Sequence, residues 1–233
     1  DYVYQIFKMA EKYFPEMDEF IYNDGTGVSF MEFAHDSSPM FLLVDRLLKR
    51  NAKVDGIGLQ FHMYDGVENA AGMGRKSYFD PAYLLQVMDQ LGQLNRPLHI
   101  SEISLPTYPE LPRDLAEEVQ GELLRYFYRT WFSQKNCQSI VYWNLCDGNA
   151  YGTENRFEAG LIDLKFNEKP AYRILDSLIN SEWHTETTIV TDKNGEGVWN
   201  GFYGEYELDF CGKIKRVALT PRSENEYPFL LPE

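Results

Sequence analysis

Short apolar runs alternate with amphipathic helical patterns along most of this chain, and this alternation is what most constrains its fold. The runs predict strands at residues 20–24, 54–62, 97–105 and 139–144. The patterns between them predict helices at residues 1–14, 38–51, 80–94, 113–134 and 170–179. Strands separated by helices form parallel βαβ units, and right-handed crossovers bring the C-terminal ends of all strands to one edge. The sequence therefore predicts an α/β fold.

Polar and aromatic side chains gather at the predicted C-terminal ends of these strands. They are Asn23, Asp24, Gln60, His62, Glu102, Trp143 and Asp147. Polar residues with only a structural use would be scattered along the strands. Barrels of alternating strands and helices collect their catalytic groups at this end. The one-sided distribution predicts an active site there.

Glu102 is the central residue of this group because it follows the apolar run that starts at residue 97. A carboxylate among apolar neighbours is costly unless it is paired or used. Gln60 and His62 are two residues apart and project to the same face of the preceding strand, which Gly56 and Gly58 leave open for neighbouring groups. A histidine on the adjacent strand can hold a nucleophilic carboxylate ionised and oriented. On this pattern alone, a catalytic Glu102 and a buried, paired Glu102 are equally good interpretations.

Composition excludes several classes of function. The 233 residues carry a net charge of −14, from 36 acidic and 22 basic side chains, which disfavours nucleic acid and anionic membranes as partners. No apolar stretch is long enough to span a bilayer, and the first residues read as helix rather than as a signal peptide. The four histidines and three cysteines form no metal-binding spacing, so the cysteines are expected to be free. We expect neither a metal site nor a cofactor.

The character of the chain changes near residue 183, which predicts a division into residues 1–182 and 183–233. The second part contains β-type alternation at 187–192, 201–210 and 213–219, with a Lys-Asn-Gly turn at 193–195. We interpret it as a small β-rich extension packed on the main domain. A separate sugar-binding module is the alternative.

Several motifs together resemble glycoside hydrolase family 10, the (β/α)₈-barrel endo-β-1,4-xylanases. They are the segments 56–62 (GIGLQFH), 100–104 (ISEIS), 143–147 (WNLCD) and 169–172 (KPAY), preceded by Asn23-Asp24. The order and spacing of these motifs cover about residues 1–182. The resemblance implies the C-terminal half of a TIM (β/α)₈ barrel, strands 5–8, followed by the β-rich extension. It also implies xylan or xylo-oligosaccharide as the substrate.

The resemblance assigns catalytic roles to two residues. Glu102 matches the nucleophile that forms a covalent glycosyl-enzyme, and His62 matches the histidine that hydrogen-bonds it. Gln60 matches a polar group of the same subsite. The threonine and aspartate that usually flank the nucleophile are replaced by Ser101 and Ser104.

Substrate-binding roles follow for four further residues. Asn23 matches the asparagine before the first motif, and Trp143 matches a tryptophan that walls the sugar beside the scissile bond. Tyr151 stands where the family usually has a second tryptophan. Asp147 is either a substrate contact or a structural hydrogen-bonding residue. The segment 63–79, which includes Tyr64, is expected to border the cleft or to be an ordinary surface loop.

One element of the family pattern is missing from this sequence. Family members carry a general acid/base Glu in a Val-Asn-Glu motif at the end of the fourth strand, and no such motif occurs here. Retaining glycosidases need two carboxyl groups. We therefore expect the N-terminal half of the barrel, from a separate chain or another segment, to supply the acid/base and to be a partner of these residues.

The overall prediction is a retaining endo-β-1,4-xylanase that is secreted, periplasmic or at the surface of a bacterium. Two alternatives remain open. One is a related barrel glycosidase that acts on another β-glucan. The other is a degenerate barrel that binds xylan without cleaving it.

Overall fold

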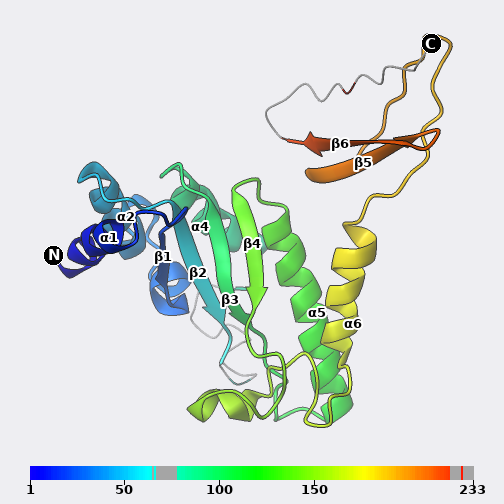
Figure 1. Cartoon of the computed structure of the whole chain (residues 1–233). Helices are drawn as coiled ribbons and strands as arrows, with labels where there is room; N and C mark the ends of the chain where they lie inside the picture. Colours follow the sequence, from blue (N-terminus) through cyan, green and yellow to red (C-terminus); the bar gives the residue numbers. More distant parts are fainter. Residues whose placement is uncertain (65, 67–77, 221–226, 228–233) are drawn as a thin grey trace. The chain divides into compact units, whose positions relative to one another are not determined.

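The computed structural model describes residues 1–64, 66, 78–220 and 227. The chain forms two compact units, Asp1–Leu175 and Asp176–Glu233 (Figure 1). Among the described helices, none is long and apolar enough to cross a membrane. The division at residues 182 and 183 stays a prediction from the sequence.

The first unit is built on one parallel sheet. Its strands are β1 (Ile21–Asp24), β2 (Gly56–His62), β3 (Leu98–Ser104) and β4 (Cys137–Tyr142), which lie side by side in chain order. All three neighbouring pairs are parallel. The prediction of four parallel strands is therefore confirmed, and their C-terminal ends share one edge of the sheet.

Helices alternate with the strands as predicted. They are α1 (Tyr2–Tyr13), α2 (Pro39–Lys49), α4 (Pro81–Gly92), α5 (Arg113–Phe132) and α6 (Pro170–Ser177), with short helical segments η1 (Gly27–Met31), η2 (His35–Ser37), η3 (Gly152–Phe157) and η4 (Leu178–Glu182). The predicted start of α4 is confirmed, because the Asp80 carboxylate accepts a hydrogen bond from Ala82 N at 2.9 Å and Pro81 occupies the first helical position.

One face of the sheet carries the apolar core. On β2 the alternate residues Ile57, Leu59 and Phe61 have no exposed surface. The Phe61 ring lies 4.8 Å from the ring of Phe127 and 4.9 Å from the ring of Trp131, both on α5. Complete burial of a side chain of this size stabilises the fold by about 1.5–3 kcal/mol. These contacts hold β2 against α5.

The opposite face of β2 is polar, and at Gly56 and Gly58 it carries no side chain. A Cβ atom on Gly58 would lie 2.6 Å from Asn23 Oδ1, and one on Gly56 would lie 2.9 Å from His99 Nε2. Glycine at these positions therefore lets side chains of β1 and β3 lie over β2, as the sequence predicts.

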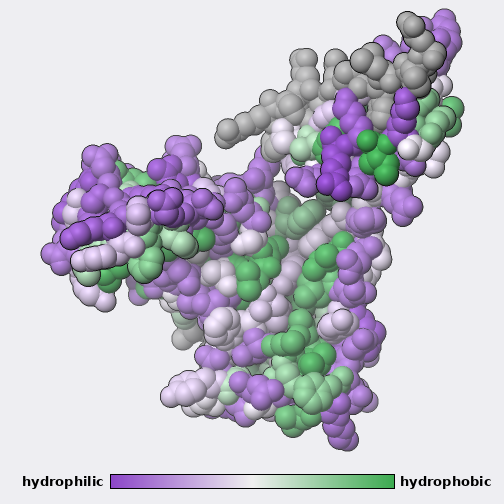
Figure 2. Space-filling view, in the orientation of Figure 1, coloured by the Kyte–Doolittle hydropathy of each residue, from purple (hydrophilic) through white to green (hydrophobic). Residues whose placement is uncertain are grey.

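This face is open to solvent in the structure. Ile21 on β1 and Val141 on β4 lie on it and are exposed, and Figure 2 shows pale and green surface over the middle of the sheet between purple flanks. Within the described residues, no further strand extends the sheet beyond β1 or β4.

The second unit contains an antiparallel hairpin of β5 (Gly204–Phe210) and β6 (Lys213–Leu219). Its two-residue turn has positive φ at Cys211 and Gly212, 52° and 82°, as such tight hairpins require. The predicted turn at residues 193–195 is also present, since Gly195 N donates to Asp192 O at 3.0 Å.

The strand predicted at residues 187–192 is wrong. This segment is extended loop. Val190 is exposed, so the apolar side of the alternation covers no core. Without a buried face, the period-two pattern has nothing to hold it in a sheet.

Candidate active site

A β-bulge in β3 sets the direction of Glu102. Leu59 pairs with Ile100, but the next residue of β2, Gln60, pairs with Glu102, so Ser101 is an extra residue on β3. The pairing of β3 with β4 shifts over the same stretch. In a regular strand, Glu102 would share the buried face of Ile100. The bulge instead turns Glu102 to the open face, as bulges beside active sites commonly do.

Two donors of β2 hold the Glu102 carboxylate. Gln60 Nε2 donates to Oε1 at 2.8 Å, and His62 Nε2 lies 3.1 Å from Oε2. The Glu102 and His62 side chains are 18% and 15% exposed. The carboxylate is thus oriented through both oxygens while remaining accessible from the open face.

The second ring nitrogen of His62 is also engaged. Its Nδ1 lies 3.0 Å from Ser104 Oγ. The Tyr64 ring stacks on the imidazole, with a centroid separation of 5.2 Å and an interplanar angle of 9°, and the Trp143 ring meets it edge-on at 6.4 Å. Both the hydrogen bonds and the rings therefore define the plane of His62.

The first strand contributes through Asn23. Ser101 Oγ donates to Asn23 Oδ1 at 2.6 Å, so the extra residue of the bulge links β3 across the Gly58 position to β1. The neighbouring Asp24 is not part of this group, because its carboxylate accepts hydrogen bonds from Tyr22 and from Gly25 N.

Trp143 and Tyr151, the two predicted sugar platforms, differ in exposure and in their contacts with the Glu102 site. Trp143 is 43% exposed and lies beside His62. Tyr151 precedes η3, is 93% exposed, and makes none of the described contacts of the Glu102 site. Their roles as sugar platforms stay predictions.

Asp147 is 3% exposed and surrounded by donors. Lys169 Nζ lies 3.2 Å from both carboxylate oxygens, Arg113 Nη2 lies 3.4 Å from one, and Gly160 N donates at 2.8 Å. Burial raises the pKa of the Asp147 carboxyl and lowers the pKa of the Lys169 amine, while attraction between the two opposes both shifts. These contacts favour the structural role, one of the two interpretations that the sequence leaves open.

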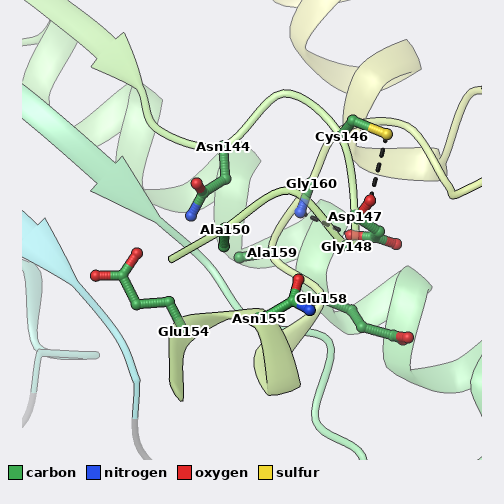
Figure 3. A pocket seen from close by; sticks show the side chains of 10 residues that line it. All are labelled: Asn144, Cys146, Asp147, Gly148, Ala150, Glu154, Asn155, Glu158, Ala159 and Gly160. Carbon is green, nitrogen blue, oxygen red and sulfur yellow. Dashed lines mark hydrogen bonds between the residues drawn. The ribbon is translucent and has the colours of Figure 1, made fainter. Parts of the chain in front are cut away.

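Figure 3 shows the hollow beside this group, which extends from Asp147 and Glu158 at one end to Asn144 and Glu154 at the other. It has no room for a ligand. Asn144 and Glu154 both reach Tyr64: Asn144 Nδ2 lies 3.4 Å and Glu154 Oε2 lies 3.1 Å from the Tyr64 hydroxyl oxygen.

The connection to Glu154 is not detectable from the sequence. Glu154 belongs to η3, far along the chain from β2 and β3, and no spacing or motif marks it. Tyr64 lies in the segment 63–79, for which the sequence predicts either a border of the cleft or an ordinary surface loop, and residues 65 and 67–77 of that segment fall outside the described residues.

Solved structures of xylanases share this fold. Xylanase 10B of Thermotoga petrophila, solved in complex with xylobiose, is 20% identical with a TM-score of 0.61, over 78% of this chain and 52% of that one. The endo-1,4-beta-xylanase XylE of Penicillium canescens is 21% identical with a TM-score of 0.57, over 77% and 52%. The chain therefore spans about half the length of these structures. The predicted fold, the C-terminal half of a (β/α)₈ barrel with a β-rich extension, is confirmed.

A curated relative is longer still. The anti-sigma-I factor RsgI6 of Acetivibrio thermocellus is 26% identical over 226 residues, which are 97% of this chain and 25% of that protein. The similarity thus includes the β-rich extension.

The family assignment rests on the first unit. The sequence profile described as glycosyl hydrolase family 10 matches residues 1–177. These residues include all four parallel strands, the bulge and the Glu102 site. The chain belongs to glycosyl hydrolase family 10.

Proposed function

We propose that the complete protein containing this chain is a retaining endo-β-1,4-xylanase with Glu102 as its nucleophile. The observation that carries the proposal is the geometry of Glu102, whose two oxygens are held by Gln60 and His62 at the open face. A carboxylate nucleophile must be ionised, oriented and accessible to the substrate. We also propose that the protein is secreted, periplasmic or at the surface of a bacterium.

The proposed reaction is a double displacement. Glu102 attacks the anomeric carbon of a xylosyl residue, the bond to the leaving sugar oxygen breaks, and an acid protonates that oxygen. Water, deprotonated by the same acid/base group, then attacks the anomeric carbon and releases Glu102. His62 and Gln60 orient the attacking carboxylate, and Trp143 forms the wall beside the sugar. Asn23 lines the cleft from β1.

The acid/base group is proposed to come from residues outside this chain. Retention requires a second carboxyl group about 5–5.5 Å from the nucleophile. Among the described side chains, those bonded to Glu102 are an amide and an imidazole.

Apolar surface supports the proposal that another half-barrel completes this one. On α1 an exposed stripe is formed by Tyr2, Ile6, Met9 and Tyr13. Their spacing places them on one face of the helix. Exposed apolar side chains on α1 and on the open sheet face are where a second half of a barrel would pack.

A comparison of residues 1–233 with the complete protein tests whether a second half-barrel is needed for activity. Purified residues 1–233 are expected to release no reducing sugar from xylan, whereas the complete protein is expected to do so, because proton donation to the leaving oxygen needs the second carboxyl group. Robust turnover by residues 1–233 would contradict the proposed origin of the acid/base.

An inactivator tests the role of Glu102. We expect 2,4-dinitrophenyl 2-deoxy-2-fluoro-β-xylobioside to label the complete protein once, on the peptide that contains Glu102. The dinitrophenolate departs without protonation, and the fluorine slows hydrolysis of the covalent intermediate. Peptide mass spectrometry identifies the site. A label on any other residue would exclude Glu102 as the nucleophile.

The similarity to an anti-sigma-I factor favours a second candidate function, binding of xylan without cleavage within a regulatory protein. Binding measured by calorimetry, with no reducing sugar released by the complete protein, would support it. A further alternative is cleavage of another β-glucan, which parallel assays on xylan, cellulose and mannan distinguish.

A further inference from the structure

A continuous set of hydrogen bonds joins Glu102 to a second carboxylate on η3. From Glu102 it passes to His62 at 3.1 Å, to Ser104 Oγ at 3.0 Å, to the Tyr64 hydroxyl at 2.9 Å, and to Glu154 Oε2 at 3.1 Å. We call these three linking side chains, His62, Ser104 and Tyr64, the relay.

Tyr64 is held by η3 at both its ring and its hydroxyl. Its ring stacks on His62 and lies 5.3 Å from the ring of Phe157, while its hydroxyl contacts Glu154, and both Phe157 and Glu154 belong to η3. Burial raises the pKa of Tyr64 to about 12, so the phenol keeps its proton and is a donor at neutral pH.

The charge of the side chain at position 154 sets which group donates and which accepts in each hydrogen bond of the relay. Tyr64 has one O–H and two acceptors within reach, Ser104 Oγ and the Glu154 carboxylate. An ionised Glu154 attracts this proton, because hydrogen bonds to a charged acceptor are the stronger ones. The Ser104 hydroxyl is then free to donate to Tyr64, which leaves Ser104 Oγ as an acceptor for a proton on His62 Nδ1.

We propose that Glu154 is a positioning residue for the His62–Glu102 pair and acts on it through Tyr64 and Ser104. With Glu154 ionised, His62 can donate from both ring nitrogens, to Glu102 at one side and into the relay at the other. An amide at position 154 can donate to Tyr64 and reverse the relay. Ser104 then donates to His62 Nδ1, which becomes the acceptor of that hydrogen bond. The effect on catalysis rests on the proposed function, whereas the effect on His62 does not.

Nitrogen NMR of the complete protein with ¹⁵N-labelled histidine tests the relay directly. His62 is assigned by the loss of its signals in His62→Asn, and the spectra of all variants are compared under the same conditions. Glu154→Gln and Tyr64→Phe are each expected to move the Nδ1 signal of His62 toward that of a nitrogen that accepts a hydrogen bond. The double variant is expected to match Tyr64→Phe alone, since both changes interrupt the same relay.

A matched control distinguishes an effect that passes through the relay from a general effect of removing one negative charge. Glu158 lies on the same segment, but its carboxylate pairs with Arg113. Glu158→Gln is expected to leave the His62 signals unchanged. Unchanged His62 signals in both Glu154→Gln and Tyr64→Phe, or an equal change in Glu158→Gln, would overturn the proposal.

The rate of inactivation by the fluoroxylobioside provides the catalytic measurement. Glu154→Gln and Tyr64→Phe are expected to slow labelling about three- to tenfold, the effect of one hydrogen bond, and Glu158→Gln less than about twofold. Unaltered labelling rates together with altered His62 signals would exclude the positioning role. If the wild-type protein takes no label, the proposed xylanase activity fails, and the NMR comparison alone then decides whether Glu154 controls His62.

Discussion

Replacement of Glu102 by alanine is expected to reduce xylan hydrolysis by the complete protein by at least about 10⁴-fold. The covalent intermediate cannot form without the carboxylate, and the remaining groups supply only binding and orientation. Initial rates on xylan and on an aryl xylobioside measure the loss. Glu118→Ala, on the exposed side of α5, is the control and is expected to retain full activity. A loss below about tenfold would show that Glu102 is not the nucleophile.

Azide distinguishes the loss of a nucleophile from the loss of an acid. In Glu102→Ala the small anion can enter the space left by the carboxylate and attack the anomeric carbon from the same side. With a dinitrophenyl β-xylobioside, the expected product is therefore the α-xylobiosyl azide. A β-azide would mean that the missing carboxylate was the acid/base, because azide would then have displaced a different carboxylate, the true nucleophile, from an already formed intermediate.

The second large expected effect concerns stability. Lys169→Met leaves the buried Asp147 carboxylate without its closest cation, although Arg113 Nη2 and Gly160 N remain within reach. Removal of one partner from a buried ion pair costs about 3–5 kcal/mol. Denaturant unfolding followed by tryptophan fluorescence is expected to show a loss of free energy of unfolding in this range.

Two further variants define the cause of this loss. Lys165→Met removes an exposed lysine from the same segment and is expected to change the free energy of unfolding by less than about 0.5 kcal/mol. In the double variant, Asp147→Asn with Lys169→Met, part of the stability should return, because the unpaired charge is gone while an oxygen still accepts from Gly160 N. A Lys169→Met protein as stable as the wild type would rule out a structural role of the pair.

Local patterns predicted much of the fold. Apolar runs and helical periodicity identified four strands and five helices, and the Asp80-Pro81 pair marked the start of α4, because capping chemistry is local. The segment 187–192 was predicted wrongly because its alternation is local too, whereas a strand also needs a partner and a core to cover.

The site could be predicted only in part. The period of two placed Gln60 and His62 on one face, where they contact Glu102. The bulge at Ser101 and the contact of Glu154 with Tyr64 depend on how strands and loops pair in space. No glycine, proline or spacing in the sequence marks either of them.

The bulge also shortens the spacing between side chains on one face of β3. In a regular strand, side chains on one face repeat every second residue, about 6.6 Å apart. Ser101 and Glu102 are adjacent, with Cα atoms about 3.8 Å apart, yet both contact polar groups of the open face. At one level of the sheet, β3 therefore forms hydrogen bonds to two other strands. Ser101 bonds to Asn23 of β1, and Glu102 bonds to Gln60 and His62 of β2. The one additional residue therefore places two polar side chains on the open face within a length of strand that normally carries one.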